Sequence, residues 1–209
     1  HVQGLASQFA ALCVGAQPGQ KVADLCAAPG GKSLTLAECM QNQGKLISGE
    51  YVESRVPLLR KAFARCGVTC AEAVQNDAAQ LRSDWGKFDR ILCDVPCSGL
   101  GVIAKKPDIR YKDLDGIENL LLSQQKILQN GADLLAENGR LVYSTCTVNR
   151  DENEEQVRTF LKNNPRFHVA VPALQLPGMQ QGEYGTLFLP HKTATDGFFA
   201  TILETESTQ

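Results

Sequence analysis

The fold of this chain is decided by a turn that joins an apolar run to a segment of helical period, Asp24-Leu25-Cys26-Ala27-Ala28-Pro29-Gly30-Gly31-Lys32-Ser33. The apolar run, Lys21 to Cys26, predicts a strand, and Lys32 to Met40 predicts a helix. The glycines permit close backbone approach to a ligand, and the helix start offers free amide donors. The turn matches neither the dinucleotide pattern G-x-G-x-x-G nor the phosphate loop G-x-x-x-x-G-K-[ST]. A structural turn alone would also explain Pro29 and Gly30.

Short apolar runs alternate with helical segments along the whole chain. The predicted strands are Lys21 to Cys26, Lys45 to Gly49, Glu72 to Gln75, Phe88 to Asp94, Gly139 to Thr145, Phe167 to Val171 and Gly197 to Leu203. The predicted helices are Gly4 to Val14, Lys32 to Met40, Ser54 to Cys66, Gly116 to Leu135 and Asp151 to Lys162. This alternation predicts an α/β, Rossmann-like fold, with a mainly parallel seven-stranded sheet and helices on both faces. In the longest helix we expect one buried stripe, formed by Ile117, Leu120, Leu121, Gln124, Ile127, Leu128, Gly131, Leu134 and Leu135.

Length and composition indicate one globular domain, residues 1–209. The chain has a formal net charge of −2 and 43% hydrophobic residues, which excludes a disordered or broadly basic protein. No apolar run approaches the roughly 18 residues of a membrane span. Eight cysteines without an N-terminal signal pattern favour a reducing, cytoplasmic location. We expect a monomer.

Acidic residues stand at the ends of three predicted strands. Glu50 follows Gly31 by 19 residues, close to the spacing of roughly 20 at which an acid meets ribose hydroxyls in such folds. Asp77 follows the third strand and Asp94 closes the fourth. Any one of these acids alone would more often be a solvated surface charge. Carboxylates suit an adenosyl ligand with a sulfonium cation and would repel a pyrophosphate, which favours S-adenosylmethionine over NAD.

Two cysteines follow neighbouring predicted strands. Cys97 lies in Asp94-Val95-Pro96-Cys97-Ser98-Gly99 and Cys146 lies in Ser144-Thr145-Cys146-Thr147, so adjacent strands would bring both thiols over one crevice. For Cys13, Cys39 and Cys93 we expect inert packing. No metal site is expected, because only Cys66 and Cys70 are closely spaced and the histidines at 1, 168 and 191 fit no paired motif.

These motifs, in this order, resemble those of the Sun-type (NOL/NOP/Sun) RNA cytosine-5 methyltransferases. The resemblance covers almost the whole chain, from Val2-Gln3 to Phe9 at one end to Asp196-Gly197-Phe198-Phe199 at the other. Gly101-Val102-Ile103, running into Lys105-Lys106-Pro107-Asp108-Ile109-Arg110, is most similar to the bacterial enzymes that act on small-subunit (16S) ribosomal RNA. The chain departs from the family pattern at Gly4, where an acid is usual, and at Glu50, where Asp is commoner. The resemblance implies a class I S-adenosylmethionine-dependent methyltransferase fold, and any N-terminal RNA-binding domain would lie upstream of His1.

The resemblance also implies roles for individual residues. Cys146 would add to carbon 6 of the cytosine, Cys97 would assist product release, Asp94 would hydrogen-bond the base, and Lys32 would hold Asp94 or the chain after it. The methyl donor would contact Cys26, Ala27, Ala28, Pro29, Gly30, Gly31, Lys32, Glu50, Asp77 and Asp94. Arg55, just after Glu50, either braces that acid or is a surface cation. The activation of Cys146, by its surroundings or by coupled protonation of the base, stays open.

Charge is segregated along the chain. The segment from Gly101 to Lys112 holds four cations and one acid, whereas residues 151–155 hold four acids in five positions. We expect RNA to contact the cations Lys105, Lys106, Arg110 and Lys112, although a solvated loop is the common alternative. Because the cytosine must be reached from both faces, a single-stranded, loop or flipped base is expected.

Several other functions are compatible with parts of this pattern. A DNA cytosine-5 methyltransferase also has a Pro-Cys turn, but the additional Thr-Cys motif argues against it. An amino-group methyltransferase would carry an Asn/Asp-Pro-Pro-aromatic turn, which residues 94–97 do not form. A tRNA cytosine-5 methyltransferase and a noncatalytic RNA-binding module with the same fold remain as alternatives. A redox protein ranks last, because the chain lacks a C-x-x-C pair.

Overall fold

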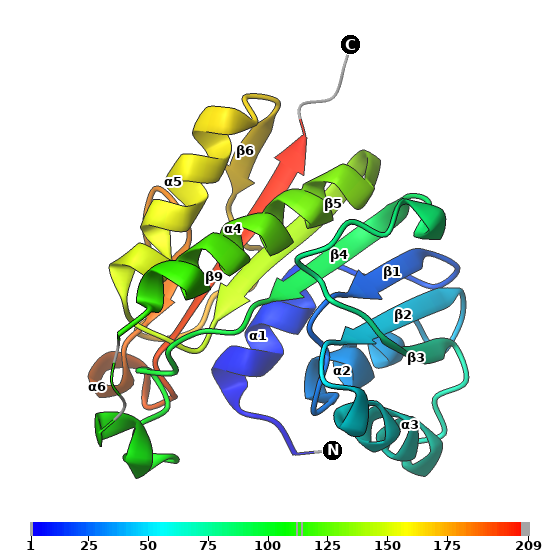
Figure 1. Cartoon of the computed structure of the whole chain (residues 1–209), viewed down its shortest axis with the longest axis horizontal. Coiled ribbons are helices and arrows are strands. Elements are labelled where there is room, and N and C mark those ends of the chain that lie inside the picture. Colours follow the sequence, from blue (N-terminus) through cyan, green and yellow to red (C-terminus); the bar gives the residue numbers. More distant parts are fainter. Residues whose placement is uncertain (1, 112, 114, 206–209) are drawn as a thin grey trace.

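The structure is a computed structural model that describes residues 2–111, 113 and 115–205. Its centre is one twisted sheet with the strand order β3-β2-β1-β4-β5-β9-β8-β7, in which β6 also pairs with β9 (Figure 1). The strands are β1 (Lys21–Asp24), β2 (Lys45–Glu50), β3 (Ala71–Gln75), β4 (Phe88–Asp94), β5 (Leu135–Thr145), β6 (Phe167–Ala170), β7 (Gln180–Gln181), β8 (Thr186–Phe188) and β9 (Phe198–Thr205).

The five strands β3, β2, β1, β4 and β5 are adjacent in the sheet and run parallel to one another. β9 runs antiparallel to β5, pairing Arg140 with Glu204 and Thr145 with Phe199. All seven predicted strands are present, which confirms the mainly parallel α/β fold. The count of seven was too low, because β7 and β8 add two short strands to the described sheet. At two and three residues they are too short to show a period-2 pattern.

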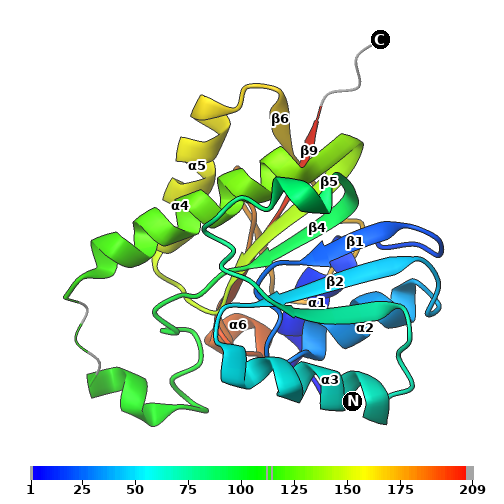
Figure 2. The same ribbon diagram turned by 45° about the vertical axis from the view of Figure 1, so that its right-hand side comes forward.

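Helices cover both faces of the sheet, as predicted. α1 (Leu5–Cys13), α2 (Gly31–Cys39) and α3 (Val56–Arg65) lie on one face, and α4 (Ile117–Leu134) and α5 (Glu154–Asn163) on the other (Figures 1 and 2). The remaining helical segments are short: α6 (Pro190–Thr193) and the 3-10 turns η1 (Glu53–Arg55), η2 (Ser83–Trp85), η3 (Pro107–Tyr111) and η4 (Arg150–Glu152). The described part of the chain contains no helix with the length and hydropathy that a membrane crossing requires.

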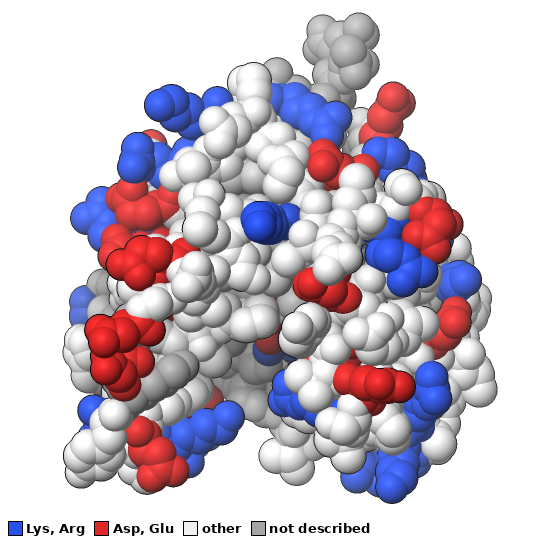
Figure 3. Space-filling view, viewed as in Figure 1, with Lys and Arg blue, Asp and Glu red and all other residues white. Residues whose placement is uncertain are grey.

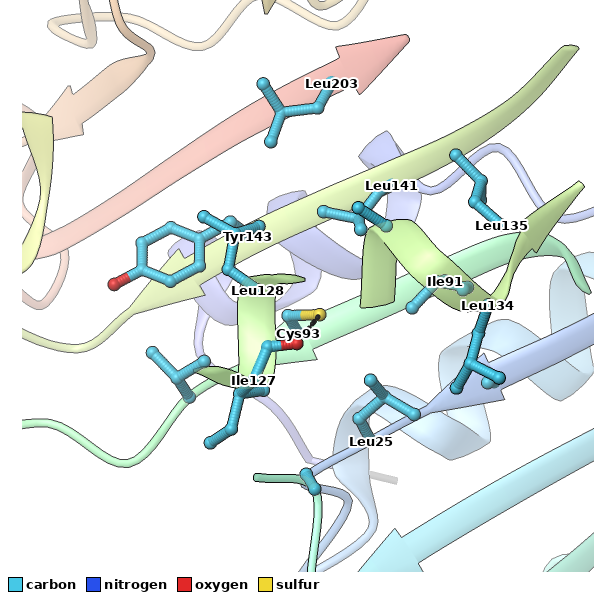
Figure 4. Packing of buried hydrophobic residues seen from close by; sticks show 14 of the residues in the cluster. Leu25, Ile91, Cys93, Ile127, Leu128, Leu134, Leu135, Leu141, Tyr143 and Leu203 are labelled. Atoms are coloured by element: carbon cyan, nitrogen blue, oxygen red, sulfur yellow. Dashed lines mark hydrogen bonds between the residues drawn. The ribbon is translucent and has the colours of Figure 1, made fainter. Parts of the chain in front are cut away.

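The face under α4 is closely packed. Ile127, Leu128 and Leu134 contact the side chains of β4 and β5 (Figure 4). A Cβ on Gly131 would lie 2.8 Å from the Cys93 sulfur, so glycine allows the helix to approach the sheet this closely. The predicted stripe is buried from Gln124 onward, whereas its first three members are only half-buried, because the start of α4 extends past the strand ends (Figure 2).

Candidate active site and cofactor crevice

The glycine turn connects β1 to α2 and is held by backbone hydrogen bonds. Ala27 N–H donates to the Gly49 carbonyl of β2 (2.8 Å), and Gly30 N–H donates to the Ala27 carbonyl (2.7 Å). Gly30 has φ of 106°, in the left-handed region that favours glycine, and a Cβ there would lie 3.0 Å from Leu59. The N-cap of α2 is Gly30, which has no side chain to accept from the amides of the first turn, so a ligand carboxylate could accept from them.

A buried carboxyl group lies beneath this turn. Asp24, fully buried at the end of β1, accepts a hydrogen bond from Ser33 Oγ (2.7 Å), which in turn accepts one from Ser48 Oγ (2.9 Å). Among the described residues the other oxygen, Asp24 Oδ1, has no hydrogen-bond partner. Burial raises the pKa of Asp24 to about 7. The sequence pattern predicted no separate role for Asp24.

Glu50 and Asp77 occupy successive strand ends at the same edge of the sheet. Glu50 is 5% exposed, and its Oε1 accepts from Val52 N–H (2.9 Å) and lies 3.6 Å from Arg55 Nη1. Both contacts engage Oε1, which leaves Oε2 for a ligand. Asp77 is half-buried and accepts from Ala79 N–H (2.9 Å), which fixes the turn after β3. The carboxylate predicted to meet ribose hydroxyls therefore ends β2, and that of Asp77 lies in the turn after the neighbouring strand β3.

Lys32 and Asp94 form an ion pair across the crevice. Lys32 Nζ lies 2.7 Å from Asp94 Oδ2, with side-chain exposures of 14% and 25%. Asp94 Oδ1 accepts a hydrogen bond from Ser144 Oγ on β5 (2.7 Å). Lys32 is the second residue of α2, so this contact ties the glycine turn to the carboxyl end of β4.

The two sequence-predicted cysteines lie side by side. Cys97, three residues after β4, and Cys146, directly after β5, bring their sulfurs to 3.2 Å. Either sulfur can donate in their hydrogen bond, which lowers the pKa of the Cys146 thiol, and the positive Lys32 acts in the same direction. The same contact and burial raise the pKa of Cys97. A lowered pKa favours the thiolate, which is the reactive form of a cysteine, and this makes Cys146 the candidate nucleophile.

The loop that follows Cys97 is fastened to the same centre. Gly101 N–H donates to the Cys146 carbonyl (3.0 Å), and Gly197 N–H donates to the Gly101 carbonyl (2.8 Å). A Cβ on Gly101 would lie 2.0 Å from the Gly197 oxygen, so only glycine fits this crossing. The loop continues into η3 and projects from the carboxyl end of the sheet (Figure 2).

The predicted RNA-contacting cations lie on this projecting loop. Lys105, Lys106 and Arg110 are exposed, and Lys105 Nζ pairs with Asp196 Oδ2 at 2.5 Å, which reduces the local positive charge. Lys112 lies outside the described residues. Figure 3 shows this face hollowed between the part that carries η3 and the part that carries α3, with Lys and Arg on both sides of the hollow.

The sequence of this chain matches a known protein family over most of its length. A family model described as "16S rRNA methyltransferase RsmB/F" matches residues 11–204. The chain belongs to the RsmB/F family.

Two curated proteins and one solved structure illustrate what this chain is similar to. A probable ribosomal RNA small subunit methyltransferase B of Bacillus subtilis is 38% identical over 207 residues, covering 95% of this chain and 46% of the relative. A ribosomal RNA small subunit methyltransferase F of Cronobacter sakazakii is 36% identical over 203 residues, 93% of this chain and 42% of the relative. The crystal structure of NSun6 from Pyrococcus horikoshii with SFG superposes with a TM-score of 0.89 at 30% identity, over 98% of this chain and 53% of that one. This chain thus spans about half the length of these proteins.

The fold of this RsmB/F chain is that of the S-adenosylmethionine-dependent methyltransferases. The crevice suits that cofactor chemically. The open amides at the start of α2 match a carboxylate, Glu50 Oε2 matches paired ribose hydroxyls, and the Asp94 carboxylate matches positive charge. Among the described residues no three His, Cys, Asp or Glu side chains form a group that could hold a metal ion.

Sequence reasoning missed one group of buried polar residues behind the cysteines of this RsmB/F chain. Glu152 belongs to the run of acids at residues 151–155, for which the sequence predicted no role in the site. In the structure Glu152 and Asn153 are both fully buried. Asn153 Oδ1 accepts from Thr145 Oγ1 (2.6 Å), next to Cys146.

Two of the cysteines predicted to be inert are buried. Burial raises the pKa of Cys13 to about 12 and also that of Cys93, in keeping with inert packing.

Proposed function

We propose that this chain is the catalytic domain of an S-adenosylmethionine-dependent RNA cytosine-5 methyltransferase, and that its substrate is small-subunit ribosomal RNA. The observation that carries the proposal is the pair of thiols 3.2 Å apart beside the Lys32–Asp94 ion pair. A single thiol would suffice for nucleophilic addition, whereas two adjacent thiols suit addition followed by elimination. The names of the relatives support ribosomal RNA as the substrate.

The proposed reaction begins at Cys146. Carbon 5 of cytosine is a weak nucleophile, and addition of a thiolate at carbon 6 converts the ring into an enamine that can attack an electrophilic methyl group. The lowered pKa of Cys146 favours the thiolate that this addition needs. S-adenosylmethionine, when bound, supplies the methyl group. A base in the crevice, such as a water molecule, then takes the carbon 5 proton. The electron pair of that C–H bond forms the C5–C6 double bond, and the sulfur of Cys146 leaves carbon 6 with the electrons of the C–S bond.

Cys97 and Asp94 would assist the steps around this addition. The Cys97 thiol, with its raised pKa, stays protonated and can return a proton to the departing Cys146 sulfur. Asp94 would accept a hydrogen bond from the exocyclic amine of the cytosine. Its oxygens already accept from Lys32 and Ser144, but each carboxylate oxygen has a second lone pair for this purpose. Lys32 thus orients Asp94 toward the base.

The cofactor would lie along the strand ends. The loop from Cys26 to Lys32 leads into α2, and the amides at the start of this helix would bind the cofactor carboxylate. The ribose would meet Glu50, which Arg55 braces. Asp77 would lie near the adenine. This arrangement leaves the methionine end at Lys32 and Asp94, next to the thiols.

RNA would reach the thiols from the side of the η3 loop. Lys106 and Arg110, and Lys105 when its pair with Asp196 opens, would contact phosphates there. The target base must leave its stack to lie between the thiols and the methyl donor. With a chain net charge of −2, nonspecific affinity for RNA should be modest.

Methyl transfer with cysteine variants tests the proposal. We expect C146A to abolish methylation of small-subunit ribosomal RNA, and C97A to accumulate a covalent RNA adduct visible as a slower band on a denaturing gel. C66A is the matched control, because Cys66 is an exposed thiol outside the crevice, and it should retain wild-type turnover.

Three results would overturn the proposal in distinct ways. Full turnover by C146A would remove the assigned nucleophile. Preferential methylation of tRNA or DNA by the wild-type protein would change the substrate. Binding of S-adenosylmethionine without transfer to any nucleic acid would establish a noncatalytic RNA-binding module.

A further inference from the structure

A fully buried carboxylate joins the two loops that carry the cysteines. Glu152, at the end of η4, is 0% exposed. Its Oε2 accepts from Ser98 N–H (2.8 Å) and from Gln124 Nε2 (3.0 Å). Its Oε1 accepts from Ser98 Oγ (2.5 Å) and from Asn149 Nδ2 (3.3 Å). All four lone-pair positions of this carboxylate therefore have a donor.

The donors come from elements that are distant in sequence. Ser98 directly follows Cys97, and Asn149 lies three residues after Cys146. Ser98 Oγ also lies 2.9 Å from Oγ1 of Thr147, the residue after Cys146. Gln124 of α4 donates to the Pro96 carbonyl as well (2.9 Å), just before Cys97. Glu152 thus accepts hydrogen bonds from Ser98, directly after Cys97, and from Asn149, three residues after Cys146.

The backbone of Glu152 is also fixed by a side chain of β5. Tyr143, fully buried on β5, donates its hydroxyl to the Glu152 carbonyl at 2.6 Å. Because the Glu152 backbone is held in this way, its carboxylate is fixed in position. The hydrogen bonds from Ser98 and Asn149 therefore attach the loop after β4 and the loop after β5 to the same fixed group. Hydrogen bonds to a charged acceptor are also stronger than neutral ones.

We propose that Glu152 is a positioning residue that sets the distance between Cys97 and Cys146. The bonds at Ser98 fix the Pro-Cys turn, and the bonds at Asn149 and through Thr147 fix the Thr-Cys turn. Their combined effect is the 3.2 Å contact between the sulfurs. The catalytic meaning of this contact rests on the proposed function, whereas the geometric claim does not.

The variant E152Q tests the proposal with almost no change of side-chain volume. Its amide group would turn an N–H₂ either toward the fixed Ser98 N–H or toward Asn149 and the Ser98 hydroxyl. In the first orientation two donors oppose each other, and in the second the Asn149 bond is lost. The matched control is E155Q, three residues further along, where the carboxylate pairs with the exposed Arg150 and Arg158.

The first readout is the distance between the thiols, measured without RNA or cofactor. Diamide oxidises two neighbouring thiols to a disulfide and is itself reduced to the hydrazine. The rate at which Cys97 and Cys146 become linked, followed by mass spectrometry of the tryptic peptides, reports their proximity. We expect E152Q to slow this linkage at least fivefold relative to wild type, and E155Q to leave it within twofold.

The second readout separates positioning from general damage. We expect the kcat for RNA methylation to fall at least twentyfold in E152Q, while the Kd for S-adenosylmethionine stays within twofold of wild type. If E152Q fails to fold, S98A serves instead, since it removes the Ser98 hydroxyl bonds and keeps the Ser98 N–H bond. Linkage within twofold of wild type, or cofactor affinity falling in parallel with kcat, would overturn the proposal. A wild-type protein inactive on RNA would contradict the proposed function and leave the linkage measurement decisive for Glu152.

Discussion

Replacing Asp24 by Asn should stabilise the protein more strongly as the pH rises. Folding raises the pKa of Asp24 from 3.8 to about 7, mainly because burial disfavours its charged form. Below pH 3.8 the carboxyl is neutral in both the folded and unfolded states. Between pH 3.8 and 7 the unfolded chain releases the proton and the folded chain keeps it, so stability is lost as pH rises. Above about pH 7 both states are ionised and the loss is complete.

The size of this effect follows from the two pKa values. Their difference, at about 1.4 kcal/mol for each pH unit, corresponds to about 4 kcal/mol of unfolding free energy in the fully ionised state. The asparagine of D24N cannot ionise, and its carbonyl oxygen can still accept from Ser33. The stability of D24N relative to wild type should therefore increase by roughly 3 kcal/mol between pH 5 and pH 8.

Urea unfolding at pH 5, 6, 7 and 8 measures this difference directly. The control is D84N, because Asp84 is a surface acid whose pKa is lowered from 3.8 by hydrogen bonding to Arg82. Asp84 is therefore ionised in both the folded and unfolded states above pH 5, and the difference between D84N and wild type should stay constant over this range. A difference between D24N and wild type that does not vary with pH would show that Asp24 is ionised throughout this range. The raised pKa would then be wrong.

Three further predictions concern the site. E50Q should weaken S-adenosylmethionine binding by about 1–3 kcal/mol, or roughly 5- to 150-fold in Kd by isothermal calorimetry, because a charged acceptor is lost; unchanged affinity would remove Glu50 from the cofactor site. G101A should reduce kcat more than tenfold with cofactor affinity unchanged, because its Cβ would lie 2.0 Å from the Gly197 oxygen; wild-type turnover would show that the loop can yield. The double variant K106A/R110A should lower the slope of log affinity for RNA against log salt by about 1.4, for two phosphate contacts on a single strand; an unchanged slope would place the RNA elsewhere.

Much of this fold could be predicted from sequence because its signals are local. The apolar runs, the glycine turn and the acids at strand ends depend on residues within a few positions of each other, and parallel strands place their carboxyl ends at one edge. Glu50, Asp77 and Asp94 accordingly lie at that edge in the structure. The short strands β7 and β8 escaped prediction because two or three residues carry no periodicity.

Local sequence patterns predicted the mainly parallel sheet, the turn at residues 24–33 and the two cysteines after neighbouring strands. They could not predict which polar groups are buried or what these groups contact, because that depends on tertiary packing. Glu152 is one of four acids within five residues, yet it alone meets Ser98, 54 positions away, and lies behind the thiols. Lys105 is paired with Asp196, 91 positions away, which no charge count could show. Burial and pairing depend on these long-range contacts, which exist only once the sheet has assembled.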